Sequence, residues 1–175
     1  MKRIILTGYM GVGKTTIGRS LAAAIGLGFY DLDWYISSRR RKSISDLFTE
    51  FGEDGFRNIE HNMLHEVCEF ENVVVSCGGG TPCFFDNMEY MNRQGETIYI
   101  KASPEYIIEH LTESRNVRPL LANMDKEQLQ TFVTQQIEER EKYYLQSKHI
   151  LSVDNDDLDE KINNFVTFFT SKSSY

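Results

Sequence analysis

The chain contains 175 residues, of which 41% are hydrophobic and 26% are charged, with 3 prolines and 12 glycines. A globular chain of this size can bury a substantial core, and the composition excludes collagen-like, low-complexity and wholly disordered proteins. The formal net charge of −7 argues against a general electrostatic attraction to nucleic acid or to an anionic membrane.

Short apolar runs alternate with stretches of helical periodicity along the chain. In chain order, the pattern predicts a strand at 2–7, a helix at 15–25, a strand at 29–33, helices at 44–51 and 56–70, a strand at 72–76, a helix at 85–93, a strand at 97–102, helices at 104–113 and 125–146, a strand at 149–153 and a helix at 158–169. Gly26 ends one of these helices, and Pro104 suits the first turn of another.

Strands that alternate with helices predict a parallel sheet covered by helices on both faces. The sequence contains no internal repeat and no linker, so we expect one domain over residues 1–175. The fold class is α/β, a three-layer α/β/α sandwich with a five-stranded parallel sheet. Ligands of such sheets bind beside the carboxyl ends of the strands, so the residues at those ends are the functional candidates.

A phosphate-binding loop is predicted between the first strand and the first helix. Residues 8–15 read GYMGVGKT, which satisfies the P-loop pattern GxxxxGK(S/T) in the context that the pattern needs. The loop N–H groups converge on phosphates, Lys14 reaches the β- and γ-phosphates, and the Thr15 hydroxyl is a ligand for Mg²⁺. No guanine-reading NKxD-like segment occurs, so a kinase or an ATPase is favoured over a GTPase.

Two acidic residues end the second predicted strand. The buried run Val73–Val75 carries no aspartate at its end, whereas Asp31 and Asp33 follow the second apolar run. Residues two apart on a strand point to opposite sides, so one carboxylate can hold Mg²⁺ through water and leave the other for the substrate. The alternative is that both aspartates only cap the next helix.

Two arginines and a glycine run indicate a second substrate. Arg140 continues the apolar stripe of the helix at 125–146 without a carboxylate three or four residues away, which favours an anion from elsewhere, such as a ligand carboxylate. The alternative is that the stem of Arg140 packs on the apolar surface while its guanidinium lies in water and binds no ligand. Arg57 has acidic neighbours at helical spacing, so an ordinary surface ion pair also explains it. Gly78–Gly80 permits close approach of the backbone to a ligand, or is a flexible turn.

The segment 114–121 reads SRNVRPLL and is polar, with two arginines. Pro119 biases Arg118 away from a helical conformation. In a phosphoryl-transfer enzyme, such a segment can form a mobile lid that excludes water and brings an arginine to the transferred phosphate. We place this lid at about residues 112–125.

Taken together, these segments resemble the shikimate kinase family, within the nucleoside-monophosphate-kinase-like group of P-loop kinases. The matching segments are GYMGVGKTTIG at 8–18, DLD at 31–33, GEDGFRNIE at 52–60, SCGGG at 76–80, VRPLL at 117–121 and EEREKYY at 138–144. The resemblance spans nearly the whole chain. It implies a phosphotransferase acting on an alcohol, with ATP-dependent phosphorylation of the 3-hydroxyl of shikimate on the route to chorismate and the aromatic amino acids.

The resemblance also implies roles for individual residues on the nucleotide side. The residues that would bind ATP are Gly11, Val12, Gly13, Lys14, Thr15, Thr16 and Arg118. The cofactor is Mg²⁺, which would be bound by Thr15 directly and by Asp31 through water. Lys14, Asp33 and Arg118 would be the catalytic residues, with Arg118 as the lid arginine.

On the acceptor side, the resemblance implies that shikimate is bound by Asp33, Arg57, Gly79 and Arg140. The arginines would bind its carboxylate and Asp33 its hydroxyl groups. One position departs from the family, because Leu111 stands where many members carry an arginine that packs on adenine. Either Arg115 or an apolar contact would then serve adenine, and the loop 154–157 would border the base.

Two other functions are compatible with a P-loop. A related small-molecule kinase, such as a gluconate kinase, is the enzymatic alternative, and a non-catalytic nucleotide switch is the other. The aspartate pair and the lid arginine argue against a switch.

We expect a cytoplasmic monomer whose partners are small molecules, with neither nucleic acid nor membrane. The apolar runs are too short for a membrane span or a signal peptide. Cys68, Cys77 and Cys83 lack metal-site spacing and are expected to be reduced, mostly buried thiols. The basic run at 39–42 is expected to be a solvated helix end.

Overall fold

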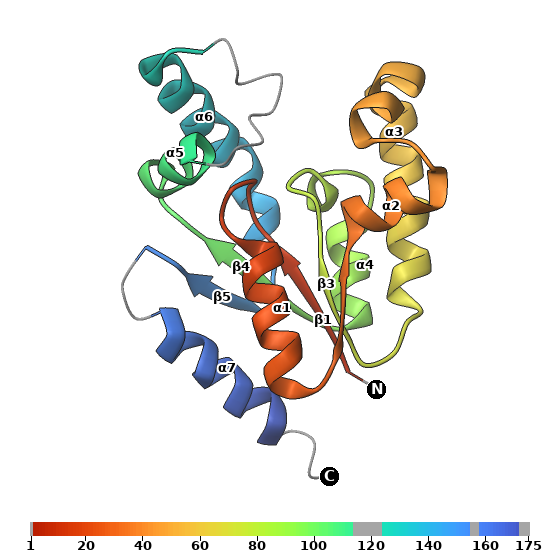
Figure 1. Ribbon diagram of the computed structural model, residues 1–175, viewed down its shortest axis with the longest axis vertical. Helices are drawn as coiled ribbons and strands as arrows, with labels where there is room; N and C mark the ends of the chain where they lie inside the picture. The colour runs from red at the N-terminus through yellow and green to blue at the C-terminus, as the bar shows by residue number, and fades with distance from the viewer. Residues whose placement is uncertain (1, 114–123, 155–157, 172–175) are drawn as a thin grey trace.

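The computed structural model describes residues 2–113, 124–154 and 158–171 (Figure 1). Within them, five parallel strands form one sheet in the order β2-β3-β1-β4-β5. The strands are β1 (Arg3–Thr7), β2 (Gly28–Asp31), β3 (Val73–Ser76), β4 (Glu96–Lys101) and β5 (His149–Ser152). The α/β class and the five-stranded parallel sheet predicted from the sequence are confirmed.

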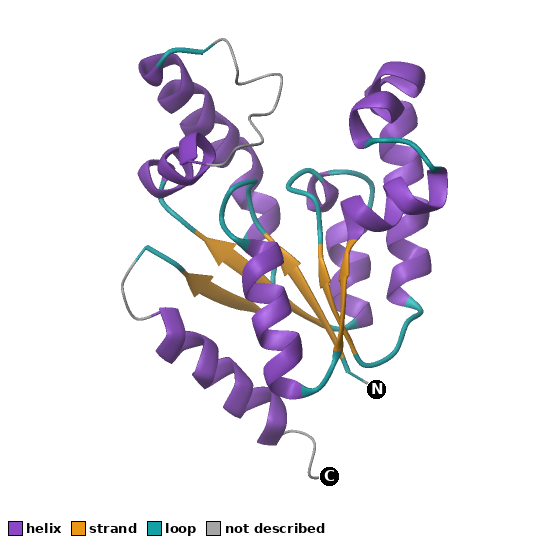
Figure 2. Cartoon of the chain, viewed as in Figure 1, coloured by secondary structure: helices purple, strands orange, loops and turns teal. Residues whose placement is uncertain are grey.

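Helices flank the sheet and extend beyond the carboxyl ends of its strands (Figure 2). They are α1 (Lys14–Ile25), α2 (Leu32–Arg40), α3 (Ile44–Cys68), α4 (Asn87–Gln94), α5 (Pro104–Glu113), α6 (Lys126–Tyr144) and α7 (Leu158–Ser171), with a 3₁₀ turn at Thr81–Cys83. None of the helices in the described ranges is both long and apolar enough to cross a membrane.

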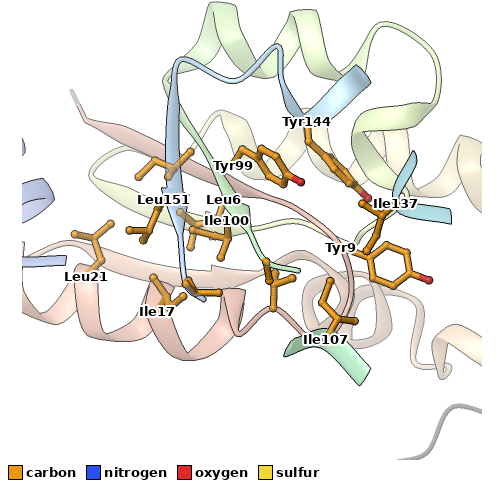
Figure 3. Packing of buried hydrophobic residues seen from close by; sticks show 14 of the residues in the cluster. Leu6, Tyr9, Ile17, Leu21, Tyr99, Ile100, Ile107, Ile137, Tyr144 and Leu151 are labelled. Carbon is orange, nitrogen blue, oxygen red and sulfur yellow. The ribbon is translucent and has the colours of Figure 1, made fainter. Parts of the chain in front are cut away.

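The alternation of side chains along β1 separates two buried clusters. Ile4 and Leu6 belong to one cluster, which includes residues of α1, β4 and α7 (Figure 3). Ile5 belongs to the other, which includes residues of α2, α3, β3 and α4. Successive residues of a strand point to opposite faces, so the all-apolar run of β1 is buried on both sides, as in a three-layer sandwich.

The second predicted strand ends two residues earlier than expected. β2 ends at Asp31, and Asp33 lies in the first turn of α2, a helix for which the sequence pattern predicted only the basic end. The Asp31 side chain accepts a hydrogen bond from the backbone N–H of Trp34 at 3.2 Å and caps the helix. Asp31 and Asp33 therefore do not alternate across a strand, and that prediction is wrong.

Two further boundaries follow from local chemistry. The helices predicted at 44–51 and 56–70 form one segment, α3, that is interrupted at Gly52, where φ is 67° and ψ is −178°. This left-handed φ suits glycine and separates two helical stretches. The basic run at 39–42 ends α2 and is exposed, as predicted.

Candidate active site

The phosphate loop connects β1 to α1 at the carboxyl edge of the sheet. Gly11 and Gly13 have φ values of 83° and 84°, which are strained for other residues. Gly13 is the N-cap of α1 and has no side chain to satisfy the first N–H groups of that helix. These N–H groups and the positive end of the helix dipole form a binding site for an anion such as a phosphate.

The ammonium group of Lys14 lies over the loop. Nζ donates hydrogen bonds to the carbonyl oxygens of Gly8 at 2.8 Å and Tyr9 at 2.7 Å, and the residue is only 8% exposed. A buried ammonium requires such partners. The loop therefore holds one positive charge at the place where the phosphates of a nucleotide would lie.

Thr15 and Asp31 meet at the start of α1. The Thr15 hydroxyl donates a hydrogen bond to Asp31 Oδ2 at 2.7 Å. A hydroxyl and a carboxylate are the hard oxygen ligands that Mg²⁺ prefers, so this pair fits a magnesium ion beside the phosphate loop. Asp31 thus does more than cap α2, because its second oxygen faces the loop. Thr16, the next residue of α1, is exposed.

The turn that contains Gly79 contacts the phosphate loop. A Cβ atom on Gly79 would lie 3.3 Å from the backbone nitrogen of Met10 and 3.5 Å from the carbonyl oxygen of Gly8. The Gly79 carbonyl also accepts a hydrogen bond from the Tyr144 hydroxyl at 2.6 Å. Burial raises the pKa of Tyr144 far above its usual value, so this donor stays protonated. The turn is held in place from two sides, which does not fit a merely flexible loop.

Asp33 reaches the same turn from α2. A Cβ atom on Gly78 would lie 3.0 Å from Asp33 Oδ1 and 3.1 Å from Glu60 Oε1. The helix N-terminus favours a carboxylate at the position of Asp33. Although its secondary structure differs from the prediction, Asp33 still lies near the glycine turn that borders the phosphate loop.

Arg57 is a buried residue of α3 that pairs with the buried Glu60 as well as with the exposed Glu53, so it is more than an ordinary surface ion pair. Its Nη1 donates to Glu60 Oε2 at 2.7 Å, and its guanidinium lies over the Phe84 ring at 4.2 Å. A Cβ atom on Gly80 would come within 2.6 Å of Nη2, so a larger residue there would displace the guanidinium from this position. The planar group is therefore fixed at the edge of the glycine turn.

Glu60 is a residue whose importance the sequence analysis missed. It is 1% exposed and accepts hydrogen bonds from Arg57 and from the Thr81 hydroxyl, the latter at 2.6 Å. A buried carboxylate needs such partners, and they in turn fix Arg57. The spacing of three residues between Arg57 and Glu60 could have predicted their ion pair. The hydrogen bond from Thr81 could not have been predicted, because Thr81 lies in a distant part of the chain.

Arg140 lies half-buried on α6, as the apolar stripe predicted. Its Nη2 donates to Gln136 Oε1 at 2.6 Å, and its guanidinium lies 5.6 Å from the centre of the Tyr9 ring. Among the described residues it forms no ion pair with a carboxylate. Arg140 thus places a positive charge near the phosphate loop that no acid of the described chain neutralises.

Leu111, the position that departs from the family pattern, packs on the phosphate loop. A Cβ atom on Gly11 would lie 3.1 Å from the Leu111 side chain. Arg115, Arg118 and most of the predicted lid at 112–125 lie outside the described residues, as do residues 155–157. Leu111 therefore presents an apolar side chain at the edge of the loop.

The three cysteines are free thiols, as expected. Burial raises the pKa of Cys68 to about 12 and that of Cys83 to about 11, so both stay protonated near neutral pH. Cys77 is also buried, and its pKa is raised for the same reason. A protonated thiol is a weak nucleophile, so these side chains are assigned no role in the chemistry.

Comparison with known proteins agrees with this geometry. The shikimate kinase family model matches residues 10–170. The shikimate kinase of Bacteroides thetaiotaomicron is 49% identical over 154 residues, which are 88% of each chain. That of Azobacteroides pseudotrichonymphae is 42% identical over 167 residues, which are 95% of this chain and 98% of the relative.

Solved structures give the same result. A crystal structure of shikimate kinase from Bacteroides thetaiotaomicron matches with a TM-score of 0.90 at 44% identity and covers 99% of both chains. Shikimate kinase from Acinetobacter baumannii, solved in complex with shikimate, matches with a TM-score of 0.86 at 26% identity, over 100% of this chain and 96% of that one. The chain therefore belongs to the shikimate kinase family.

Proposed function

We propose that this protein transfers the γ-phosphoryl group of ATP to the 3-hydroxyl of shikimate. The observation that carries this proposal is the contact between the Gly79 turn and the phosphate loop, with Asp33 and Arg57 at the same turn. A hydroxy acid bound there would lie next to the phosphates. The family membership and the relative solved with shikimate support the choice of acceptor.

On the nucleotide side, we assign the phosphates to the backbone of residues 11–16 and to Lys14. Lys14 would exchange its two carbonyl contacts for the β- and γ-phosphates. Following the family resemblance, Thr15 would hold Mg²⁺ directly and Asp31 would hold it through water; the 2.7 Å contact between their oxygens supports placing both at one ion. When bound, the ion neutralises charge on the phosphates. Arg118 is assigned to the transferred phosphate on the basis of the family resemblance.

On the acceptor side, Arg57 and Arg140 would bind the shikimate carboxylate. Both carry planar guanidinium groups that suit bidentate contacts to a carboxylate. Gly79 would supply close backbone approach, and Asp33 would accept a hydrogen bond from the attacking hydroxyl and orient its oxygen toward phosphorus. Phosphoryl transfer depends mainly on such positioning and on charge stabilisation.

We further propose that residues 1–175 act as one kinase domain, that the protein is a monomer, and that it works in the cytoplasm. All described strands belong to one sheet, which supports a single domain. The free thiols fit a reducing compartment.

A coupled assay of ADP release tests the proposed reaction. The protein is mixed with ATP and Mg²⁺, with either shikimate or gluconate as the acceptor. We expect rapid ADP release with shikimate and only the background rate with gluconate or without an acceptor. Faster turnover with gluconate would assign the protein to a related small-molecule kinase, and acceptor-independent hydrolysis would favour a nucleotide switch.

Asp31→Asn should raise the Mg²⁺ concentration needed for half-maximal activity. Asparagine caps helices as well as aspartate does, and when its oxygen caps α2 its amide nitrogen faces the Thr15 hydroxyl as a donor in place of Oδ2. The substitution therefore removes the negative charge and one acceptor oxygen at the metal site. We expect excess Mg²⁺ to restore much of kcat. A Mg²⁺ titration at saturating shikimate and ATP measures this. If excess Mg²⁺ instead rescued Asp33→Asn and not Asp31→Asn, the roles of the two aspartates would be reversed.

Arg140→Ala should weaken shikimate binding by roughly 10- to 150-fold, because a hydrogen bond to a charged group contributes about 1.5–3 kcal/mol. Arg140→Lys should recover little of this loss, since lysine lacks the planar fork. Affinity for a non-hydrolysable ATP analogue should change little. Calorimetric titration with each ligand separates the two sites, and Arg40→Ala, at the exposed end of α2, is the control. Weakened nucleotide binding with normal shikimate binding would contradict the assignment.

A further inference from the structure

Two histidines one turn apart on α3 lie beside an aspartate that precedes α4. One ring nitrogen each of His61 and His65 and a carboxylate oxygen of Asp86 lie within 4.8 Å of one another. Over the described ranges, no other trio of His, Cys, Asp or Glu side chains is gathered in this way. The spacing of four residues places both histidines on the same face of α3, and α3 and α4 are neighbours in the structure.

A buried asparagine fixes the tautomer of His61. The Asn87 side chain is 0% exposed, and its Nδ2 donates to the Thr81 carbonyl at 2.9 Å. Its Oδ1 is then an acceptor and lies 2.6 Å from His61 Nδ1, so Nδ1 carries the proton. Nε2 of the neutral ring is left with a lone pair. A metal-binding histidine commonly donates its other N–H to an oxygen in this way.

Aromatic packing does not account for histidine at position 65. The His65 ring stacks on Tyr90 with centres 3.7 Å apart and an angle of 14° between the planes, and it lies 4.4 Å from the His61 ring. Its Nε2 is buried and makes no hydrogen bond within the part of the chain that the structure describes. A phenylalanine would stack here without a polar nitrogen to desolvate, so the ring nitrogens indicate a ligand-binding role.

Asp86 completes the group from the solvent side. The residue is exposed, and its 3.3 Å ion pair with Arg93 joins two half-exposed side chains, which makes it weak. The carboxylate can therefore move toward the histidines at small cost. Bound Zn²⁺ requires ligand distances of about 2.0–2.2 Å to nitrogen and oxygen, so a modest rotation of this exposed side chain would close the site.

We propose that His61, His65 and Asp86 bind one divalent transition-metal ion of the Zn²⁺ class and thereby join α3 to α4. Two imidazoles and one carboxylate suit Zn²⁺, whereas Mg²⁺ prefers oxygen ligands only. Water completes the coordination on the exposed side. This site is separate from the nucleotide site, and it requires neither ATP nor the proposed kinase activity.

Calorimetric titration of the untagged protein with Zn²⁺, in excess Mg²⁺ that saturates oxygen-only sites, tests the proposal. We expect one ion per chain. His61→Gln, His65→Gln and Asp86→Asn should each weaken binding by at least about tenfold, since even loss of a group that supports a ligand costs 10–100-fold. His110→Gln, which removes an exposed histidine of α5, is the matched control and should bind as the wild type does. Asp86→Asn changes an exposed side chain and keeps the test valid if a histidine variant fails to fold.

Co²⁺ absorption spectra distinguish this site from the thiols. Nitrogen and oxygen ligands give weak visible bands, whereas a thiolate ligand such as Cys83 adds an intense near-ultraviolet charge-transfer band. We expect the visible bands alone, and we expect them to weaken in the His65→Gln variant. Three results would overturn the proposal. The wild type could bind no metal, the His65→Gln and Asp86→Asn variants could bind Zn²⁺ as tightly as the wild type does, or the Co²⁺ spectrum could show a thiolate band.

Discussion

Replacing Lys14 with alanine is expected to lower kcat by about 10²–10³-fold, which is the loss typical of removing one charge-stabilising group from a transition state. The backbone of the phosphate loop would still bind phosphates, so the apparent affinity for ATP should fall less than kcat. The folded state should persist, because the carbonyls of Gly8 and Tyr9 that Lys14 contacts can accept hydrogen bonds from water instead.

Steady-state kinetics at saturating ATP and shikimate measure this effect. Circular dichroism should show an unchanged spectrum, and Lys126→Ala, on the exposed start of α6, is the matched control. Tenfold in rate corresponds to about 1.4 kcal/mol. A Lys14→Ala variant that keeps more than about a tenth of kcat would therefore show that the ammonium does not act on the transferred group.

Replacing Asp33 with alanine is expected to lower kcat by about 10²–10⁴-fold, the range for loss of a group that orients or deprotonates the nucleophile. Asp33→Asn keeps the shape and one acceptor oxygen and should lose less. The loss of kcat in Asp33→Asn measures the contribution of the charge and of proton removal, and the further loss in Asp33→Ala measures the contribution of positioning. Because positioning matters more in a loose transition state, the second loss should be the larger.

Asp54→Asn, an exposed change on the neighbouring helix α3, is the control for this pair. Excess Mg²⁺ should restore neither Asp33 variant, in contrast to Asp31→Asn. An Asp33→Ala variant with normal kcat and normal KM for shikimate would remove Asp33 from the mechanism.

The phosphate loop was predictable because its chemistry is local. The glycines, Lys14 and Thr15 occur in one continuous motif, and the strand before it and the helix after it follow from hydrophobic pattern alone. The partial burial of Arg140 was also predictable, since the apolar stripe of a regular helix fixes which residues face the core.

The surroundings of Arg57 were not predictable, because they are assembled from distant segments. Glu60 lies on the same helix, but Phe84, Thr81 and Gly80 come from the turn after β3. Nothing in the spacing of Arg57 and its acidic neighbours distinguishes a buried pair from a surface pair. Tertiary contacts decide that burial.

The place of Asp33 was predicted wrongly for a different reason. An apolar run followed by two aspartates fits a strand as well as it fits a strand followed by a capped helix. Asp31 binds the backbone N–H of Trp34, and this capping starts α2 within the stretch that was assigned to the strand. The residue still approaches the Gly78–Gly80 turn because the carboxyl ends of parallel strands share one edge of the sheet.

The central claim is the identity of the acceptor and of the hydroxyl that receives phosphate. The direct measurement is ¹H–³¹P correlation spectroscopy on a reaction that contains ATP, Mg²⁺ and equal amounts of shikimate and gluconate. We predict a single new phosphate ester whose phosphorus couples to the proton on carbon 3 of shikimate, with an equal amount of ADP. A phosphate ester on gluconate, or at another shikimate hydroxyl, or inorganic phosphate without any ester, would contradict the account.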